Sequence, residues 1–325
     1  MKIEPRIKPR WIRPRLIKPG VVTGMIAVAL VAASPGISAS SIPNPTGVPT
    51  QMVITVLRAR GGGEPASLEA KDLTVLRGKT PAPVVRFERL TGALGDMQLF
   101  VLLDDSTRSS SLGTHLPELK TFLESLPATT QVAVGYMRNG TFGLAQAFTA
   151  DHQKAASALR LPVAIPGENG SPYFALSDLA KHWPSKESTD RRAVLMLTDG
   201  VDRYYDTANV EDPYVDAAIH DALKDGMLVY SIYLRGAGDG RSDTVTNFAQ
   251  SRLSEVSQET GGQAYFQNFS DPVTISPFLG DFQDRLANQY LATIEVFNEK
   301  GVQPVKLRTE LPGLKIQGPT RIYAR

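Results

Sequence analysis

The sequence predicts an α/β protein in which a doubly wound, mostly parallel sheet is joined to a small β-sandwich-like domain. Between residues 93 and 289, continuous apolar runs of strand length alternate with segments of helical apolar spacing. Such runs indicate strands that are covered on both faces, as in parallel sheets with helices on either side. At both ends of the chain, strand-like segments follow one another without helices, which predicts the sandwich.

The β segments come from the two ends of the chain. In residues 41–92 the strand-like runs are Met52–Ala59, Leu73–Gly78 and Ala82–Leu90. In residues 290–325 they are Tyr290–Phe297, Val305–Leu311, Leu314–Gly318 and Arg321–Ala324. Because a few strands cannot close a core alone, we expect residues 290–325 to pack with residues 51–92.

Residues 93–289 are expected to form the parallel-sheet domain. Buried strands are predicted at Met97–Leu103, Ala193–Leu197 and Met227–Leu234, and further strands at Gln131–Met137 and Ala264–Gln267. Helices are predicted at Leu116–Leu126, Gln153–Leu159, Tyr173–His182, Val215–Leu223, Val245–Val256 and 276–289, where apolar residues recur every three or four positions. In open parallel sheets, ligand sites lie beyond the carboxyl ends of the strands, so functional residues are sought there.

The first 40 residues have the pattern of an export signal. Seven lysines and arginines precede the apolar run Val21–Ala33, and the small residues Ser38–Ser40 follow it. A run of 13 residues is shorter than the roughly 20 that a membrane span needs. We therefore expect cleavage near Ala39 and a periplasmic or secreted protein without a membrane span. An uncleaved signal would instead leave the protein anchored in the membrane.

Composition excludes several classes of function. The net charge is +2, but residues 1–40 carry +6, so the rest of the chain carries −4. A mildly acidic body argues against nucleic acid as a partner. The absence of cysteine excludes thiol catalysis, and the four histidines lack the spacing of zinc ligands. No nucleophile motif of the G-x-S-x-G type is present, so we expect no enzyme.

Two of the buried strands end in carboxylates. Asp104 follows Leu99–Leu103, and Asp199 follows Ala193–Leu197. The carboxyl ends of parallel strands lie at one edge of the sheet, where oxygen ligands can hold a hard cation such as Mg²⁺ or Ca²⁺. The candidate ligands at this edge are Asp104, Ser106, Ser171 and Asp199. A register shifted by one residue would instead use Asp105, Thr107 and Ser109.

These residues resemble the metal-ion-dependent adhesion site of the von Willebrand factor A family. The Thr198-Asp199-Gly200 sequence fits that pattern, and Asp104-x-Ser106 fits half of the Asp-x-Ser-x-Ser motif. Outside the site, Leu253–Gly262 and the segment DFQDRLANQYLATIEV resemble bacterial exported proteins related to this family, of the acidobacterial type. The resemblance covers about residues 50–325 and implies a Rossmann-like A domain at residues 93–289.

Arg108 stands where this motif has its second serine, and two alternatives follow. The side chain can point to solvent and leave a cation site, or it can turn inward and replace the cation. In the second case it would receive an acidic residue of a partner, so Arg108 is a candidate partner-binding residue. Tyr204 and Tyr205 follow the Asp199 loop and are candidate partner-binding residues, whereas Asp202 is expected to be a solvated loop carboxylate.

The function predicted from the sequence is an exported, non-enzymatic module of the protein-binding or adhesion type. It would bind an unknown protein partner, with Mg²⁺ or Ca²⁺ at the degenerate site as an intermediary. The alternative is a metal-free structural or assembly module with the same fold. An exported hydrolase is the least supported reading, because no nucleophile–base pair is visible in the sequence.

Overall fold

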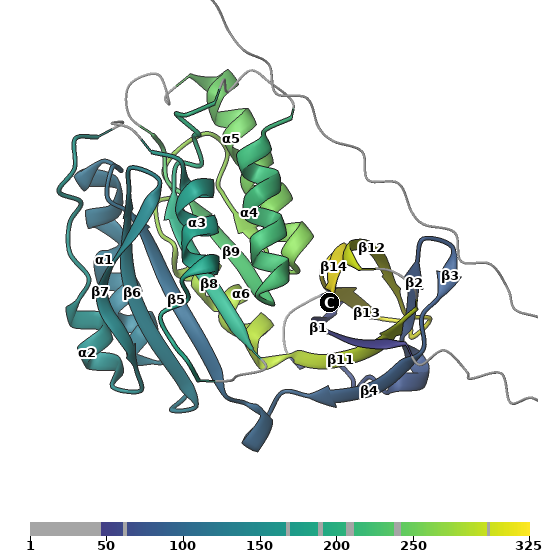
Figure 1. The fold of residues 1–325 in the computed structure, drawn as a ribbon. Helices are drawn as coiled ribbons and strands as arrows, with labels where there is room; N and C mark the ends of the chain where they lie inside the picture. The colour runs from purple at the N-terminus through teal and green to yellow at the C-terminus, as the bar shows by residue number, and fades with distance from the viewer. Residues whose placement is uncertain are drawn as a thin grey trace, which may run out of the picture. The chain divides into compact units, whose positions relative to one another are not determined.

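The computed structural model describes residues 47–60, 64–166, 170–187, 191–205, 211–236, 242–297 and 300–325 (Figure 1). The predicted export signal at residues 1–40 lies outside this part of the chain. Within the described residues, no helix has the length and apolar character needed to cross a membrane.

A six-stranded sheet with the order β10-β9-β8-β5-β6-β7 forms the larger layer of the fold. Its strands are β5 (Met97–Asp104), β6 (Thr130–Arg138), β7 (Thr141–Thr149), β8 (Arg192–Thr198), β9 (Met227–Tyr233) and β10 (Ala264–Tyr265). All neighbours are parallel except β6 and β7. This is the order of a doubly wound sheet. From β5 the chain adds β6 and β7 on one side and then β8, β9 and β10 on the other, so the topological switch point lies between β5 and β8. The predicted fold class is confirmed.

Helices cover both faces of this sheet (Figure 1). They are α1 (Ser109–Glu124), α2 (His152–Ser157), α3 (Pro172–Lys181), α4 (Pro213–Lys224), α5 (Asp243–Thr260) and α6 (Ser276–Ala287). Leu99 and Val101 of β5 pack with α1, α2 and α6, whereas Phe100 and Leu102 pack with α3, α4 and α5. Every residue of β5 is buried, which explains the continuous apolar run Leu99–Leu103 within it.

Strand β7 was not predicted from the sequence. It forms a hairpin with β6 through Asn139 and Gly140, which both have positive φ, at 53° and 72°. Two consecutive residues with positive φ are typical of the tight turn that an Asn-Gly pair favours. Every residue of β7 is exposed or half-buried at the edge of the sheet, so its sequence lacks the apolar run that marks the buried strands.

Two four-stranded antiparallel sheets form the sandwich, with the orders β13-β1-β11-β4 and β14-β12-β2-β3. Their strands are β1 (Val48–Arg58), β2 (Thr74–Arg77), β3 (Thr80–Pro81), β4 (Val84–Arg89), β11 (Gln289–Val296), β12 (Gly301–Arg308), β13 (Leu314–Gln317) and β14 (Arg321–Ala324). Short 3₁₀ turns lie at Ala70–Asp72 and Gly92–Leu94. Ile54, Val75, Ile294 and Ile322 share one buried core, so the two ends of the chain combine as predicted.

Glu118 joins α1 to the start of α6. Its Oε2 accepts hydrogen bonds from the backbone N–H groups of Ile275 (3.0 Å) and Ser276 (2.7 Å) and from the hydroxyls of Thr274 and Ser276. Its Oε1 lies 3.0 Å from Nδ1 of His115. The carboxylate therefore supplies the acceptor that the first N–H groups of α6 need.

Candidate functional site

Asp104, the last residue of β5, lies at the switch point of the sheet. Its Oδ1 accepts hydrogen bonds from the Ser106 N–H (2.9 Å) and the Ser106 hydroxyl (2.7 Å). Its Oδ2 accepts one from the Thr198 hydroxyl at the end of β8 (2.8 Å). Burial, reinforced by the charge of Asp199, raises the pKa of Asp104 to about 6. The carboxylate thus links the ends of β5 and β8, and its charged form is destabilised by burial and by the charge of Asp199.

Asp199 follows β8 and forms a buried ion pair with Arg203. The distances are 2.5 Å from Asp199 Oδ2 to Arg203 Nη2 and 3.4 Å from Oδ1 to Nη1. The Val201 N–H also donates to Oδ1, at 3.0 Å. Only 3% of the Asp199 side chain and 14% of the Arg203 side chain are exposed. Burial works against the charge of Arg203, but the carboxylates of Asp199 and Asp104 raise its pKa above the ordinary value.

Gly200 gives the loop after β8 its course. It has φ +67°, and a Cβ on it would lie 2.8 Å from the side chain of Leu253 on α5. A residue with a side chain would therefore be strained in its backbone and would also collide with α5. The glycine of the Thr198-Asp199-Gly200 sequence is thus required for the turn that follows Asp199.

Arg108 does not supply the positive charge at the carboxylates. It is the N-cap residue of α1, with φ −67° and ψ 130°, and its side chain makes no capping hydrogen bond. The residue is half-buried, and no residue in the described part of the chain pairs with its guanidinium. A guanidinium does turn towards the carboxylates, as one of the two alternatives for Arg108 predicted, but it is the guanidinium of Arg203. This role of Arg203 was not predicted from the sequence.

Ser171 joins the loop before α3 to the Asp199 loop. As N-cap of α3 it accepts a hydrogen bond from the Phe174 N–H (3.2 Å), and its hydroxyl donates to Asp202 Oδ2 (2.7 Å). Asp202 also accepts from the Tyr204 N–H (2.8 Å) and is fully buried. The expectation of a solvated Asp202 was therefore wrong, because this carboxylate ties two loops together. Burial raises the pKa of Asp202.

The shifted register of Asp105, Thr107 and Ser109 is not brought together. The Asp105 carboxylate pairs with Arg160, at 2.6 and 3.3 Å, and accepts from the Val163 N–H at 3.1 Å. The Thr107 hydroxyl donates to the backbone carbonyl of Asp104, and the Ser109 hydroxyl lies 3.5 Å from the carbonyl of Pro162. The register with Asp104 and Ser106 is the one that faces Asp199.

A divalent cation does not fit this arrangement while Arg203 is in place. Both carboxylate oxygens of Asp104 and of Asp199 already accept hydrogen bonds or ion pairs. The remaining cavity, lined by Asp104, Ser106, Ser171 and Arg203 among others, has a volume of about 10 Å³. That volume admits about one water molecule. Among the described residues, no group of three or more His, Asp or Glu side chains is placed to hold a metal ion.

Exposed aromatic side chains lie beside the Asp199–Arg203 pair. Tyr204 is 42% exposed and Phe174 is 39% exposed, and their rings meet edge to face at 5.7 Å. Tyr214 packs against Phe174 at 4.4 Å, and the half-buried Tyr205 contacts Tyr214 at 6.0 Å. A Cβ on Gly140, in the turn between β6 and β7, would lie 3.0 Å from Tyr204 and 3.1 Å from Phe174. We call Phe174, Tyr204, Tyr205 and Tyr214 the aromatic cluster.

A second exposed apolar group lies near the end of β5. Leu161, Val163 and Ile165, which we call the apolar loop, are each at least half exposed. Asp105 holds this loop, because it accepts from the Val163 N–H through its side chain and from the Ala164 N–H through its carbonyl. The alternation of apolar residues with proline and alanine in LPVAIP was the available signal in the sequence.

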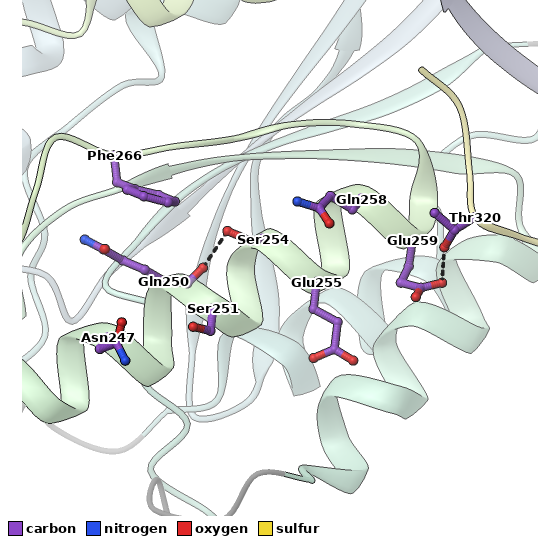
Figure 2. A pocket seen from close by; sticks show the side chains of 9 residues that line it. All are labelled: Asn247, Gln250, Ser251, Ser254, Glu255, Gln258, Glu259, Phe266 and Thr320. Atoms are coloured by element: carbon purple, nitrogen blue, oxygen red, sulfur yellow. Dashed lines mark hydrogen bonds between the residues drawn. The ribbon is translucent and has the colours of Figure 1, made fainter. Parts of the chain in front are cut away.

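A separate cavity of about 410 Å³ lies along the polar face of α5 (Figure 2). Most of its lining comes from this one helix, with Phe266 and Thr320 at its borders. Ser254 donates to the carbonyl of Gln250, and Glu259 accepts from Thr320 and pairs with Arg321. The described lining contains no histidine or lysine that could serve as a base beside these hydroxyls, so the sheet edge is the better candidate site.

No protein-family model and no curated protein sequence matches the chain. Among solved structures, the chain is similar to an aerotolerance-related membrane protein from Bacteroides fragilis (16% identity, TM-score 0.41, 58% of this chain and 98% of that one). It is also similar to BatB from Bacteroides thetaiotaomicron (15%, TM-score 0.41, 58% and 96%). A third is the vWF domain of the pilus tip protein Mfa5 from Porphyromonas gingivalis (11%, TM-score 0.39, 59% and 94%). Likeness at this level says nothing about function, and the fold assignment rests on the strand order itself.

Proposed function

We propose that the chain is an exported, non-enzymatic protein-binding module that uses the carboxyl edge of its parallel sheet. The observation that carries this proposal is the position of the exposed aromatic cluster and the apolar loop around the switch point. Open α/β sheets bind ligands at this point. Exposed aromatic side chains beside polar groups are typical of the residues that anchor protein interfaces.

The chemistry of the edge favours binding over catalysis. The four histidines make their contacts elsewhere, with Glu118, the Thr130 carbonyl, Asp178 and Asp221. The hydroxyls of Ser106 and Ser171 donate to Asp104 and Asp202, and no histidine or lysine in the described residues accompanies them. A hydrolase would need an activated nucleophile with a base that can pass the proton on.

The partner that suits this edge offers apolar side chains to the aromatic cluster. It also offers an acidic residue to two arginines that lie at the same edge of the sheet. Arg108 is half-buried and Arg138 is exposed, and both lie near the Asp104 end of β5. An acidic residue of the partner would meet these two guanidinium groups, because Arg203 is already paired with Asp199. An ion pair at the rim of an interface affects the association rate and its salt dependence more than the final affinity.

Photocrosslinking with a matched control tests the proposed binding surface. A photoreactive amino acid is placed at Tyr204 and, as control, at Phe266, which is 41% exposed but lies at the cavity on α5. We expect a specific crosslinked protein from position 204 only. The double variant Phe174→Ser/Tyr204→Ser should lose the partner, whereas Phe266→Ser should retain it. Equal retention by both variants would show that the partner binds elsewhere.

Export is part of the same proposal and has its own test. The basic, apolar and small-residue segments of residues 1–40 support it. Cell fractionation of the tagged full chain should place it in the periplasm or the medium. Its mass should correspond to a chain that has lost about 40 residues by cleavage of the signal. Recovery of the full-length chain in the membrane fraction would mean that the signal is retained as an anchor.

A further inference from the structure

We propose that Arg203 is a built-in cation that takes the place of a divalent metal ion at the switch point. The protein then binds no Mg²⁺ or Ca²⁺ there, and removal of the guanidinium converts the edge into a divalent-cation site. This inference concerns the same surface as the proposed function, but it is tested by metal binding and not by partner binding. The two can therefore fail separately.

The need for a cation follows from the buried carboxylates. Asp104, Asp199 and Asp202 all lie buried at this edge of the sheet. Buried like charges destabilise a fold unless a positive charge or hydrogen-bond donors compensate them. Arg203 is placed to compensate two of these, because it pairs with Asp199 directly and interacts electrostatically with Asp104.

The position of Arg203 is fixed by contacts with its own loop and with the loop before α3. Its backbone N–H donates to the Gly170 carbonyl (3.0 Å), and its Nη1 donates to the Val201 carbonyl (3.3 Å). The preceding residue, Asp202, is held by Ser171 and by the Tyr204 N–H. The planar guanidinium thus meets a carboxylate and a carbonyl in a preorganised geometry, which a lysine could not reproduce.

A guanidinium and a divalent ion exclude one another at this place. Asp199 Oδ2 lies 2.5 Å from Arg203 Nη2, so that oxygen is occupied. Two positive charges a few ångströms apart repel strongly at a buried position. Without the guanidinium, two carboxylates and the hydroxyls of Ser106, Ser171 and Thr198 would line the enlarged cavity. A set of oxygen ligands with a few waters is what Mg²⁺, Mn²⁺ and Ca²⁺ require.

The test measures Mn²⁺ binding by electron paramagnetic resonance, and Mg²⁺ and Ca²⁺ binding by calorimetry, on the full chain. Wild type and Arg203→Lys, which keeps the positive charge, should bind no cation at this edge. Arg203→Ala and Arg203→Gln should bind Mn²⁺ with an affinity at least about tenfold above the detection limit at which wild type shows no binding. Their melting temperatures should also rise with added cation, because a ligand that binds only the folded state stabilises it. The double variant Arg203→Ala/Asp199→Asn should lose this gain.

Several outcomes would overturn the inference. One is a wild-type protein that binds Mg²⁺ and melts at a higher temperature in its presence, an effect that Asp199→Asn removes. Another is a folded Arg203→Gln variant that binds no cation. The glutamine variant keeps most of the side-chain volume, so it serves as the deciding variant if Arg203→Ala does not fold.

Discussion

Asp104 and Glu118 are two carboxylates that each accept several hydrogen bonds, yet the protein moves their pKa values in opposite directions. Burial and the charge of Asp199 raise the pKa of Asp104 to about 6. Burial alone would raise the pKa of Glu118 too, but donors from Ser276, Thr274, His115 and Ile275 together lower it to about 2. Hydrogen-bond donors outweigh burial at Glu118, which suits a carboxylate that makes a structural contact. Asp104 retains a repulsive neighbour, which is typical of functional sites.

Among substitutions of the three carboxylates Glu118, Asp105 and Asp104, Glu118→Gln is expected to have the largest effect on stability. The substitution keeps the shape of the side chain but removes the negative charge. The backbone N–H groups at the start of α6 then lose their charged acceptor. We expect the free energy of unfolding to fall by about 1.5–3 kcal/mol, because hydrogen bonds to charged groups contribute that much. Urea denaturation measures the change, with Glu124→Gln, an exposed position on the same helix, as a control that should behave like wild type.

The same contact predicts how stability depends on acid. The pKa of Glu118 is about 2 in the folded protein and 4.5 in the unfolded chain. Its stabilisation is therefore complete above pH 4.5 and is lost as the pH falls towards 2. Denaturation curves at pH 5, 4 and 3 should show wild type approaching Glu118→Gln. If the difference in free energy of unfolding between wild type and the variant stayed constant over this range, the shape of the side chain and not its charge would account for the stabilisation.

A smaller loss is expected from Asp105→Asn. Asp105 pairs with Arg160, whose side chain is 43% exposed, and accepts from the Val163 N–H. Because solvent weakens such a pair, we expect a cost of about 0.5–1 kcal/mol. Hydrogen exchange should become faster in residues 160–165 and stay unchanged at Asp199 and Arg203. Faster exchange at both places would show that Asp105 supports the site itself.

Asp104→Asn should have the smallest effect and the opposite sign. The substitution removes the repulsion from Asp199, so we expect equal stability or a gain within about 1 kcal/mol at pH 7.5. The folded pKa of about 6 lies above the unfolded value of 3.8. Wild type therefore gains stability as the pH falls from 6 to 3.8, and its difference from the variant shrinks. A large loss at pH 7.5 would place Asp104 with Glu118 as a structural carboxylate.

The fold could be predicted from the sequence because its strands are buried on both faces and its helices are amphipathic. Strand β7 escaped prediction because an edge strand with exposed residues has no apolar run, although Asn139-Gly140 marked its turn. The meeting of Asp104 with the Thr198-Asp199 end followed from topology, since parallel strands end at one edge. Arg203 and Asp202 could not be placed, because their positions depend on contacts with Gly170 and Ser171 in a distant loop.

The pairing of β1 with β11 and β13 has a consequence for the order in which the chain folds. Strand β1 is made near the start of the chain, but its partners begin at Gln289 and Leu314. Pairing over such a sequence separation is slow, because a long loop must close first. The parallel sheet can therefore assemble while β1 still lacks both neighbours, and an unpaired strand is exposed to aggregation until β11 and β13 have been made. Synthesis of β11 and β13 is then the step that pairs β1 on both sides.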